Sequence, residues 1–280
     1  MLLFTRVGTL CTFLFLSYSL FSQTPRPSLG NIPLGASSQA KGNQHLFSDD
    51  VWGSFNDLSS ILLSTSEVGV THRSIFQEVA YSAIGVVHPI HSDWSTSIGI
   101  QSIGDSYLSE QSIDLGSVHQ IGIIRLGGGI SYNQLRAEGV NTLQLITFNF
   151  AVRTKLSSKV SLGVGMKNVG QSMYKEGIFG ADKSSLLAFG FHYQINSFFK
   201  FSTSFERDKY QPLQFKSGFE YQWKKYLFLR GGVQMFPFDI SLGSGFHHKK
   251  WKVDYAFSSD DVFAWSHQFS ICYVIRKLKS

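Results

Sequence analysis

Apolar and polar residues alternate with a period of two over most of this chain, and no other feature constrains its fold as strongly. In residues 198–206, Phe199, Phe201 and Phe205 fall on one side of an extended strand, while Lys200 and Glu206 fall on the other. Successive side chains of a β-strand point to opposite faces, whereas a helix repeats about every 3.6 residues. The alternation therefore predicts β-strands with one apolar and one polar face.

The same pattern recurs from about residue 67 to the end of the chain, with turn residues between the segments. Fourteen strands are predicted, at 66–73, 78–89, 93–103, 111–121, 124–136, 143–155, 158–168, 185–194, 198–207, 213–223, 226–236, 239–248, 250–258 and 265–275.

Alternation alone does not separate a membrane barrel from a soluble β-sandwich, but three further features favour the barrel. Most predicted strands run roughly nine to twelve residues, which suits a tilted membrane strand, whereas soluble strands average about five or six. Their apolar faces are crowded with Phe, Tyr and Trp, and the connection around His247-His248-Lys249 is very short. We expect an all-β fold, a transmembrane antiparallel β-barrel of about fourteen strands; a soluble all-β protein stays open as the alternative.

The first residues predict export. Residues 1–6 carry one positive charge, Val7 to Phe21 are mostly apolar, and Ser22 before Gln23 offers a cleavage point. This is the pattern of a secretory signal peptide, with an apolar core too short to span a membrane as a helix. We expect a cleaved signal at 1–22 and a location in the bacterial cell outer membrane. No later apolar stretch has the length of a spanning helix.

Residues 23–65 do not alternate. Pro25, Pro27 and Pro33 interrupt regular structure, and a polar stretch leads into Asp49-Asp50-Val51-Trp52. A barrel of about fourteen strands is too wide for side chains alone to fill, so its interior needs water, a plug or a ligand. We predict that residues 23–65 form an N-terminal plug and that residues 66–280 form the barrel.

The polar faces of the strands predict the lining of the lumen. The candidate lumen residues are Arg153, Lys167, Lys200, Glu206, Lys216, Glu220, Arg230, Lys252 and Asp254. They could line a polar path or hold the plug by charge pairing; alternatively, any barrel interior needs solvated charges, and neighbours such as Glu220 and Arg230 pair across the sheet. The net charge of +6 does not indicate nucleic acid as a partner, because the Lys and Arg residues are scattered without a binding motif.

Nothing in the sequence fixes a catalytic or metal site. The candidates for a nucleophile, a base and an orienting group are His267 beside Ser266, His192, and the pairs Asp49-Asp50 and Asp260-Asp261. The doublet His247-His248 would point to opposite faces of a strand, which makes it a poor metal pair and more typical of a turn. We expect no enzyme, no metal site and no cofactor.

Two smaller features concern packing. Gly127-Gly128-Gly129 lies in a predicted strand, where glycine indicates a bend or a close approach of another chain segment. With Cys11 removed in the signal, only Cys272 remains, so no internal disulfide is predicted.

Several short motifs resemble, in their order, the FadL-like outer-membrane barrels, and most closely the PorV/PorQ-type proteins of Bacteroidetes that are associated with type IX secretion. The motifs are LGASSQA at 34–40, SDDVWGSFN at 48–56, LGVGMKNVG at 162–170, GFEY at 218–221, LRGG at 229–232, VDYAF at 253–257 and HQFS at 267–270. The family usually continues Asn-Pro-Ala-Gly where this chain has Asp57-Leu58-Ser59-Ser60. The resemblance implies fourteen strands and an N-terminal plug, with Asp49, Asp50, Trp52 and Asn56 as plug residues.

Two functions follow from the resemblance. The first is an accessory of type IX protein secretion, whose partners are secretion-system components or secreted proteins. The alternative is a FadL-like channel for small hydrophobic molecules. In both cases the surrounding partner is outer-membrane lipid.

Overall fold

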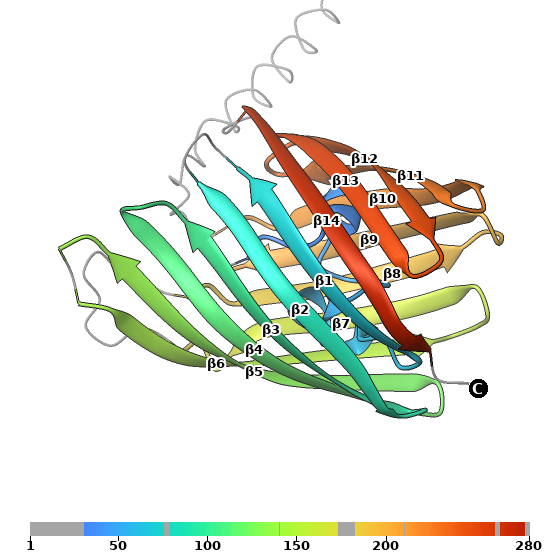
Figure 1. The fold of residues 1–280 in the computed structure, drawn as a ribbon, viewed down its shortest axis with the longest axis horizontal. Coiled ribbons are helices and arrows are strands. Elements are labelled where there is room, and N and C mark those ends of the chain that lie inside the picture. The colour runs from blue at the N-terminus through green and yellow to red at the C-terminus, as the bar shows by residue number, and fades with distance from the viewer. Residues whose placement is uncertain are drawn as a thin grey trace, which may run out of the picture.

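The computed structural model describes residues 31–75, 79–139, 141–172, 183–209, 211–260 and 264–277, and its strands form one closed barrel (Figure 1). The strands are β1 Thr65–Ser74, β2 Ala80–His91, β3 Trp94–Gly104, β4 Leu108–Ile121, β5 Ile124–Ala137, β6 Leu143–Lys155, β7 Val160–Val169, β8 Leu186–Gln194, β9 Phe199–Asp208, β10 Gln214–Lys224, β11 Leu227–Met235, β12 Asp239–His248, β13 Trp251–Asp260 and β14 Ala264–Lys277.

Each strand pairs antiparallel with its neighbours in sequence, and β1 pairs with β14 to close the sheet. Closure leaves no strand edge without a hydrogen-bonding partner, as a strand surrounded by lipid requires. The prediction of fourteen strands is confirmed, and the boundaries agree closely; β4 begins at Leu108 where 111 is predicted.

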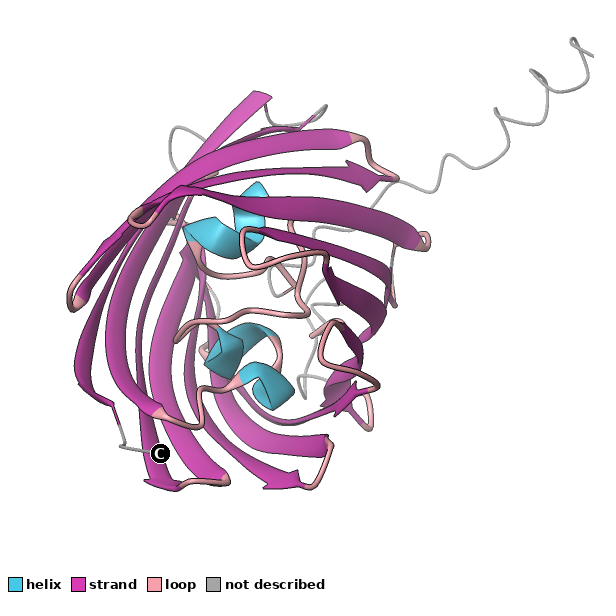
Figure 2. Cartoon of the chain, turned by 90° about the vertical axis from the view of Figure 1, so that its right-hand side faces the viewer, coloured by secondary structure: helices cyan, strands magenta, loops and turns pink. Residues whose placement is uncertain are grey.

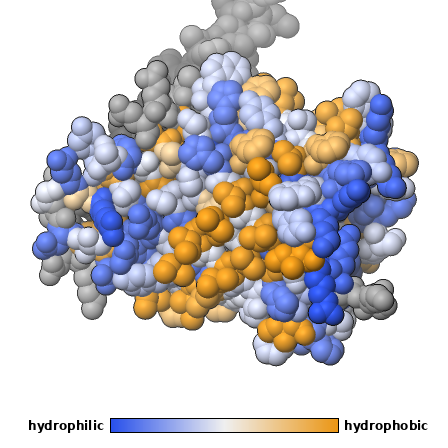
Figure 3. Space-filling view, viewed as in Figure 1, coloured by the Kyte–Doolittle hydropathy of each residue, from blue (hydrophilic) through white to orange (hydrophobic). Residues whose placement is uncertain are grey.

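The alternation places large apolar side chains outside the barrel and polar ones inside. On β9, Phe205 is 45% exposed while its neighbour Glu206 is fully buried. Trp223, Trp251 and Trp265 are likewise more than half exposed. An apolar band crosses the visible face of the molecule, with hydrophilic residues toward both ends (Figure 3). A soluble β-sandwich would bury these rings between its sheets, whereas here they face outward, as in a barrel surrounded by lipid. The alternative of a soluble all-β protein is therefore excluded.

In the described part of the chain the helices are short: α2 Ala36–Ala40, α3 Gly53–Asn56 and the 3₁₀ turn η2 Leu58–Ser60. Among the described residues, no helix has the length and apolar character needed to cross a membrane.

Residues 34–61, which we call the inner segment, lie inside the barrel, where Figure 2 shows the helices enclosed by strands. The α2 helix contacts β11 to β14, and η2 contacts β4 to β6 on the other side of the lumen. Leu34, Phe47, Trp52 and Ile61 are almost fully buried. The domain boundaries and the obstructing role of residues 23–65 stay predictions, and the predicted signal peptide lies outside the described residues.

Glycines on the inner face of the wall let the inner segment approach closely. A Cβ atom on Gly127 of β5 would lie 2.5 Å from the carbonyl carbon of Leu58, and one on Gly232 of β11 would lie 2.2 Å from the backbone nitrogen of Gly42. Real Cβ atoms do not tolerate such distances, because they lie far inside van der Waals contact. The close approach predicted from Gly127-Gly128-Gly129 is therefore confirmed.

The predicted strand 239–248 is confirmed to its last residue, so the interpretation of His247-His248 as a turn is wrong. Both residues end β12, where His247 pairs with Lys252 and His248 pairs with Trp251. The ring of His248 also packs on Tyr226, with ring centroids 4.7 Å apart. The hairpin instead turns at residues 249–250, where Lys249 has a positive φ of 54°, as tight two-residue hairpins require.

Exchange of Gly127 for valine tests the close approach. We expect Gly127→Val to lower the free energy of unfolding by about 1–3 kcal/mol, because the new side chain overlaps the backbone of Leu58. The measurement is urea unfolding of the vesicle-inserted protein, followed by heat-modifiable mobility. Gly128→Val is the matched control, since a Cβ there meets nothing closer than Phe150 at 3.7 Å. Equal midpoints for the two variants would contradict the packing described here.

Candidate functional site: contacts between the inner segment and the barrel wall

The polar faces of the strands bring the predicted lumen residues toward the inner segment. Arg153 comes from β6, Lys167 from β7, Lys200 and Glu206 from β9, Lys216 and Glu220 from β10, Arg230 from β11, and Lys252 and Asp254 from β13. All of them except Lys167 form ion pairs. Lys167 makes no ion pair with any residue that the structure describes. A role in a polar path stays a prediction for the whole set.

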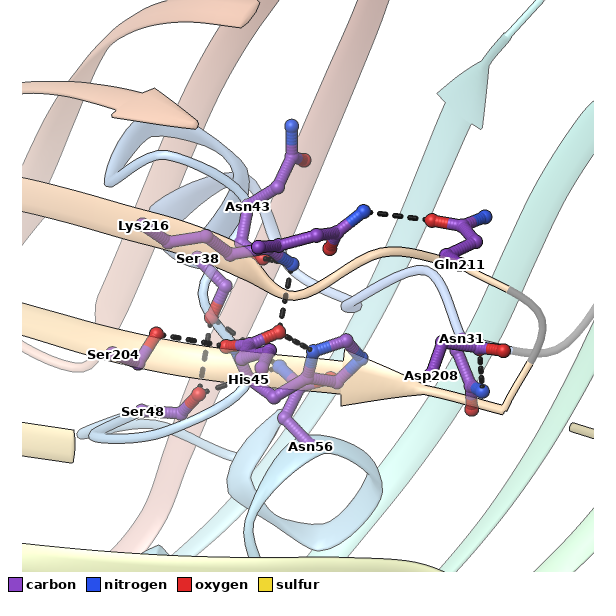
Figure 4. A network of polar contacts seen from close by, with 12 residues as sticks. Asn31, Ser38, Asn43, His45, Ser48, Asn56, Ser204, Asp208, Gln211 and Lys216 are labelled. Carbon is purple, nitrogen blue, oxygen red and sulfur yellow. Dashed lines mark hydrogen bonds and ion pairs between the residues drawn. The ribbon is translucent and has the colours of Figure 1, made fainter. Parts of the chain in front are cut away.

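The Glu206 carboxylate is the centre of one buried network. Its partners His45, Lys216 and Ser204 are labelled in Figure 4. The carboxylate accepts hydrogen bonds from the Lys216 ammonium at 2.7 Å, from His45 Nδ1 at 2.7 Å and from the His45 backbone N–H at 3.0 Å. Burial lowers the pKa of the His45 imidazole to about 4, so the ring is neutral and donates its Nδ1 hydrogen. Lys216 also donates to the carbonyl of Asn43 at 2.8 Å. Strands β9 and β10 thereby hold residues 43–45.

Arg153 anchors the middle of the inner segment from β6. Its guanidinium donates to the Asp57 carboxylate at 3.2 Å and lies 4.9 Å from the centroid of the Phe47 ring. Asp57 also accepts from the backbone N–H groups of Ser59 at 3.0 Å and Phe47 at 3.2 Å. Arg153 thus positions the Asp57 carboxylate, whose hydrogen bonds connect η2 to Phe47.

A row of alternating charges follows the wall across β9 to β13. Lys200 lies 3.3 Å from Asp49 of the inner segment and 3.1 Å from Glu220. Arg230 then contacts Glu220 at 2.7 Å and Asp254 at 2.6 Å. Opposite charges on neighbouring strands attract, and the predicted pairing of Glu220 with Arg230 is confirmed.

A second contact row lies at β1, β13 and β14. Glu67 pairs with Lys252 and accepts a hydrogen bond from the backbone N–H of Val51 at 3.0 Å. Nearby, Asp50 accepts from the Ser37 hydroxyl at 2.5 Å and from the backbone N–H of Trp52. Burial raises the pKa of Asp50 to about 6.

The four residues predicted for the plug all lie in the inner segment. Trp52 is buried, and Asp50 joins the first helix to the turn before α3. The Asn56 side chain accepts from the Leu34 N–H at 2.8 Å and donates to the Leu34 carbonyl at 2.7 Å, closing the segment on itself. Asp49 is half exposed and faces Lys200 and Arg153. Whether the segment blocks passage stays a prediction.

Sequence reasoning missed the small polar residues that hold α2. Gln39 donates to the hydroxyls of Ser258 at 3.0 Å and Ser266 at 2.8 Å, and the Ala36 N–H donates to Ser270 at 2.9 Å. The serines alternate with apolar residues on β13 and β14, so their inward direction is visible in the sequence. Their partner is not, because it lies more than two hundred residues away.

Ser266 and His267, considered as nucleophile and base, point to opposite faces of the wall. Ser266 is buried and faces Gln39, whereas His267 faces outward and bonds to the Tyr255 hydroxyl at 2.7 Å. The ring of His192 lies beside that of Phe47, with centroids 5.5 Å apart. Asp261 and the side chain of Asp260 lie outside the described residues. Within the described ranges, no three His, Cys, Asp or Glu side chains form a group that could hold a metal.

One small cavity separates the inner segment from part of the wall. A cavity of about 20 Å³ lies between the inner segment and β4 to β7, lined by Asn56, Leu58, Asp114, Ser131 and Lys167 among others. This volume holds about one water molecule.

Removal of the Glu206 charge tests the buried network. Glu206→Gln leaves Lys216 buried without its counter-charge, and loss of one partner of a buried pair costs about 3–5 kcal/mol. We expect a fall of that order in the free energy of unfolding, measured in urea with the protein in lipid vesicles. Glu138→Gln removes an exposed carboxylate and is expected to change stability little. Similar losses in both variants would rule out a special role for the network.

The fold agrees with solved outer-membrane channels. The monoaromatic hydrocarbon channel CymD superposes with a TM-score of 0.65 at 10% identity, covering 90% of this chain and 99% of its own. The toluene transporter TodX of Pseudomonas putida gives 0.65 at 12% identity, covering 89% and 98%. A FadL homologue of Pseudomonas aeruginosa gives 0.62 at 9% identity, covering 90% and 99%. No protein-family model and no curated protein sequence matches the chain. The chain therefore has the fold of the FadL-like barrels, while a specific likeness to PorV/PorQ proteins finds no support.

Proposed function

We propose that this protein spans the outer membrane as a channel for small hydrophobic molecules and that its inner segment is the plug of that channel. The observation that carries the proposal is a closed barrel whose lumen is occupied by a segment of its own chain. Proteins described as a monoaromatic hydrocarbon channel and a toluene transporter share the fold. No feature of the described residues favours a role in protein secretion over this one.

The two halves of the inner segment are attached to the wall in different ways. Residues 51–61 join an apolar cluster in which Val51, Trp52, Phe55, Leu58 and Ile61 pack on wall residues, among them Tyr81, Val87, Ile103, Val118 and Cys272. Residues 36–49 make smaller apolar contacts, in which Ala36 and Ala40 pack on Ala256 while Leu46 and Phe47 pack on Ala188. Their other attachments are hydrogen bonds and ion pairs to β9 through β14. Apolar burial is lost when a segment moves into water, whereas polar contacts are exchanged for contacts with water. We therefore assign the movement that opens the channel to residues 36–49, with residues 51–61 as the fixed anchor.

Uptake by a deletion strain tests the channel. We expect cells that lack the protein to take up toluene several-fold more slowly than the parent, with uptake restored by the intact gene. The measurement is accumulation of labelled toluene, run beside an assay of total protein secretion. Normal uptake together with defective secretion would reject the channel in favour of the secretion accessory.

A pair of disulfide locks tests which half of the plug moves. A Cβ atom on Gly243 of β12 would lie 2.6 Å from both the Cβ of Ala40 and the carbonyl oxygen of Tyr255, so Ala40→Cys with Gly243→Cys forms a disulfide only after the backbone shifts by about 1 Å. Cys272→Ser is added there to avoid mispairing. We expect oxidation of this variant to abolish toluene uptake and a reductant to restore it.

The matched control locks the anchor with the native cysteine. The Val51 Cγ1 and Cys272 Sγ atoms lie 2.6 and 2.9 Å from the same point, the position of a Cβ on Gly69. These two atoms are therefore at most about 5.5 Å apart, and Val51→Cys places a thiol in the neighbourhood of Cys272. A disulfide between them, its formation checked by thiol titration, is expected to leave uptake unchanged. If the two locks act alike, or if the Ala40 lock has no effect, the assignment of the moving half is wrong.

A further inference from the structure

We propose that the short-turn end of the barrel binds the headgroups of anionic phospholipids in one membrane leaflet. The surface involved is the basic rim, which consists of eight exposed side chains, Lys155, Lys159, Lys224, Lys225, Lys249, Lys250, Arg276 and Lys277. This inference does not depend on which molecule passes through the barrel.

The exposed charged side chains at this end are almost all positive. Among the described residues of the turns and strand ends there, Asp93 is the only carboxylate outside the lumen. His91 Nδ1 lies 2.8 Å from its Oδ1 atom. At the opposite end the described exposed charges are mixed, with Arg136, Arg207 and Lys209 beside Glu138. A surface with many cations and few competing carboxylates attracts anions from its surroundings.

The basic rim lies beside outward aromatic rings. The Lys224 ammonium lies 5.3 Å from the ring centroid of Trp223, Lys225 lies 5.6 Å from that of Tyr226, and Lys250 lies 5.6 Å from that of Tyr273. Aromatic girdles mark the depth at which a barrel passes from hydrocarbon to headgroups. The rim cations therefore lie at the level of the phosphates, within reach of them.

The distribution of the rim favours a leaflet over a protein partner. Its members come from the β6–β7, β10–β11 and β12–β13 connections and from the end of β14, which occupy more than half of the strand order. They lie toward the end at which the C-terminus is marked in Figure 1. A flat layer of headgroups meets all these points together, whereas a protein docks on one side. Short turns of such barrels face the periplasm, so the leaflet is the inner one.

The test measures the lipid that surrounds the protein. The intact exported chain is inserted into vesicles of phosphatidylethanolamine containing a minor fraction of phosphatidylglycerol, and polymer-excised discs are analysed for the ratio of the two lipids. We expect phosphatidylglycerol to be enriched several-fold over the bulk vesicle at low salt. The enrichment is expected to fall as salt rises, because exposed charges are screened.

Two matched triple variants locate the effect. Lys225→Gln, Lys249→Gln and Lys250→Gln remove three rim cations and are expected to reduce the enrichment at least two-fold. Arg136→Gln, Arg207→Gln and Lys209→Gln remove three cations at the other end and are expected to leave it unchanged. Heat-modifiable mobility confirms that each variant is folded.

Three results would overturn the proposal. The first is a lipid ratio around the unaltered protein that equals the ratio in the bulk vesicle. The second is equal enrichment of phosphatidylglycerol in both triple variants. The third is tight binding of a poly-glutamate peptide that persists in phosphatidylglycerol-rich vesicles, which would identify the rim as a surface for an acidic protein.

Discussion

Charges enclosed by a closed barrel need partners, and most of this structure follows from how they obtain them. The apolar parity of each strand must face lipid, so the polar parity faces the lumen. Glu206 and Lys216 are buried there, and an unpaired charge in such a place would be strongly destabilising. The inner segment helps to meet this requirement, because its backbone N–H groups, carbonyls and side chains complete networks that the wall alone leaves open.

The wall residues are complementary to the inner segment in both shape and charge. Glycines at 127 and 232 remove side chains where the inner segment comes closest, so its backbone reaches the wall itself. Arg153 forms an ion pair with the carboxylate of Asp57, and Lys200 forms one with that of Asp49. The larger apolar cluster contains residues 51–61, whereas more of the polar contacts involve residues 36–49. That difference is the basis of our proposal that the segment acts as a plug which moves at one end.

The outer surface is organised along the barrel axis. Apolar side chains form the central band, aromatic rings lie near its short-turn edge, and lysines extend beyond them. The same order is present at the β10–β11 and β12–β13 hairpins, whose lysines lie next to Trp223, Tyr226 and Tyr273. The repeated local pattern gives the closed barrel an end with a common sign of charge.

The sequence by itself determined the number of strands, their near-correct limits and the direction of nearly every side chain, because a period of two is a local property of extended chain. Even the pairing of Glu220 with Arg230 was accessible, since hairpin neighbours are close in sequence. The turn at His247-His248 was placed wrongly, because charged Lys249 and Lys250 satisfy the tight turn better than two rings that pack on the adjacent strand. Only the tertiary structure decided which wall residue meets His45, Asp57 or Gln39. Those contacts join residues about a hundred or more positions apart, and they depend on closure of the barrel around the inner segment, which no local pattern encodes.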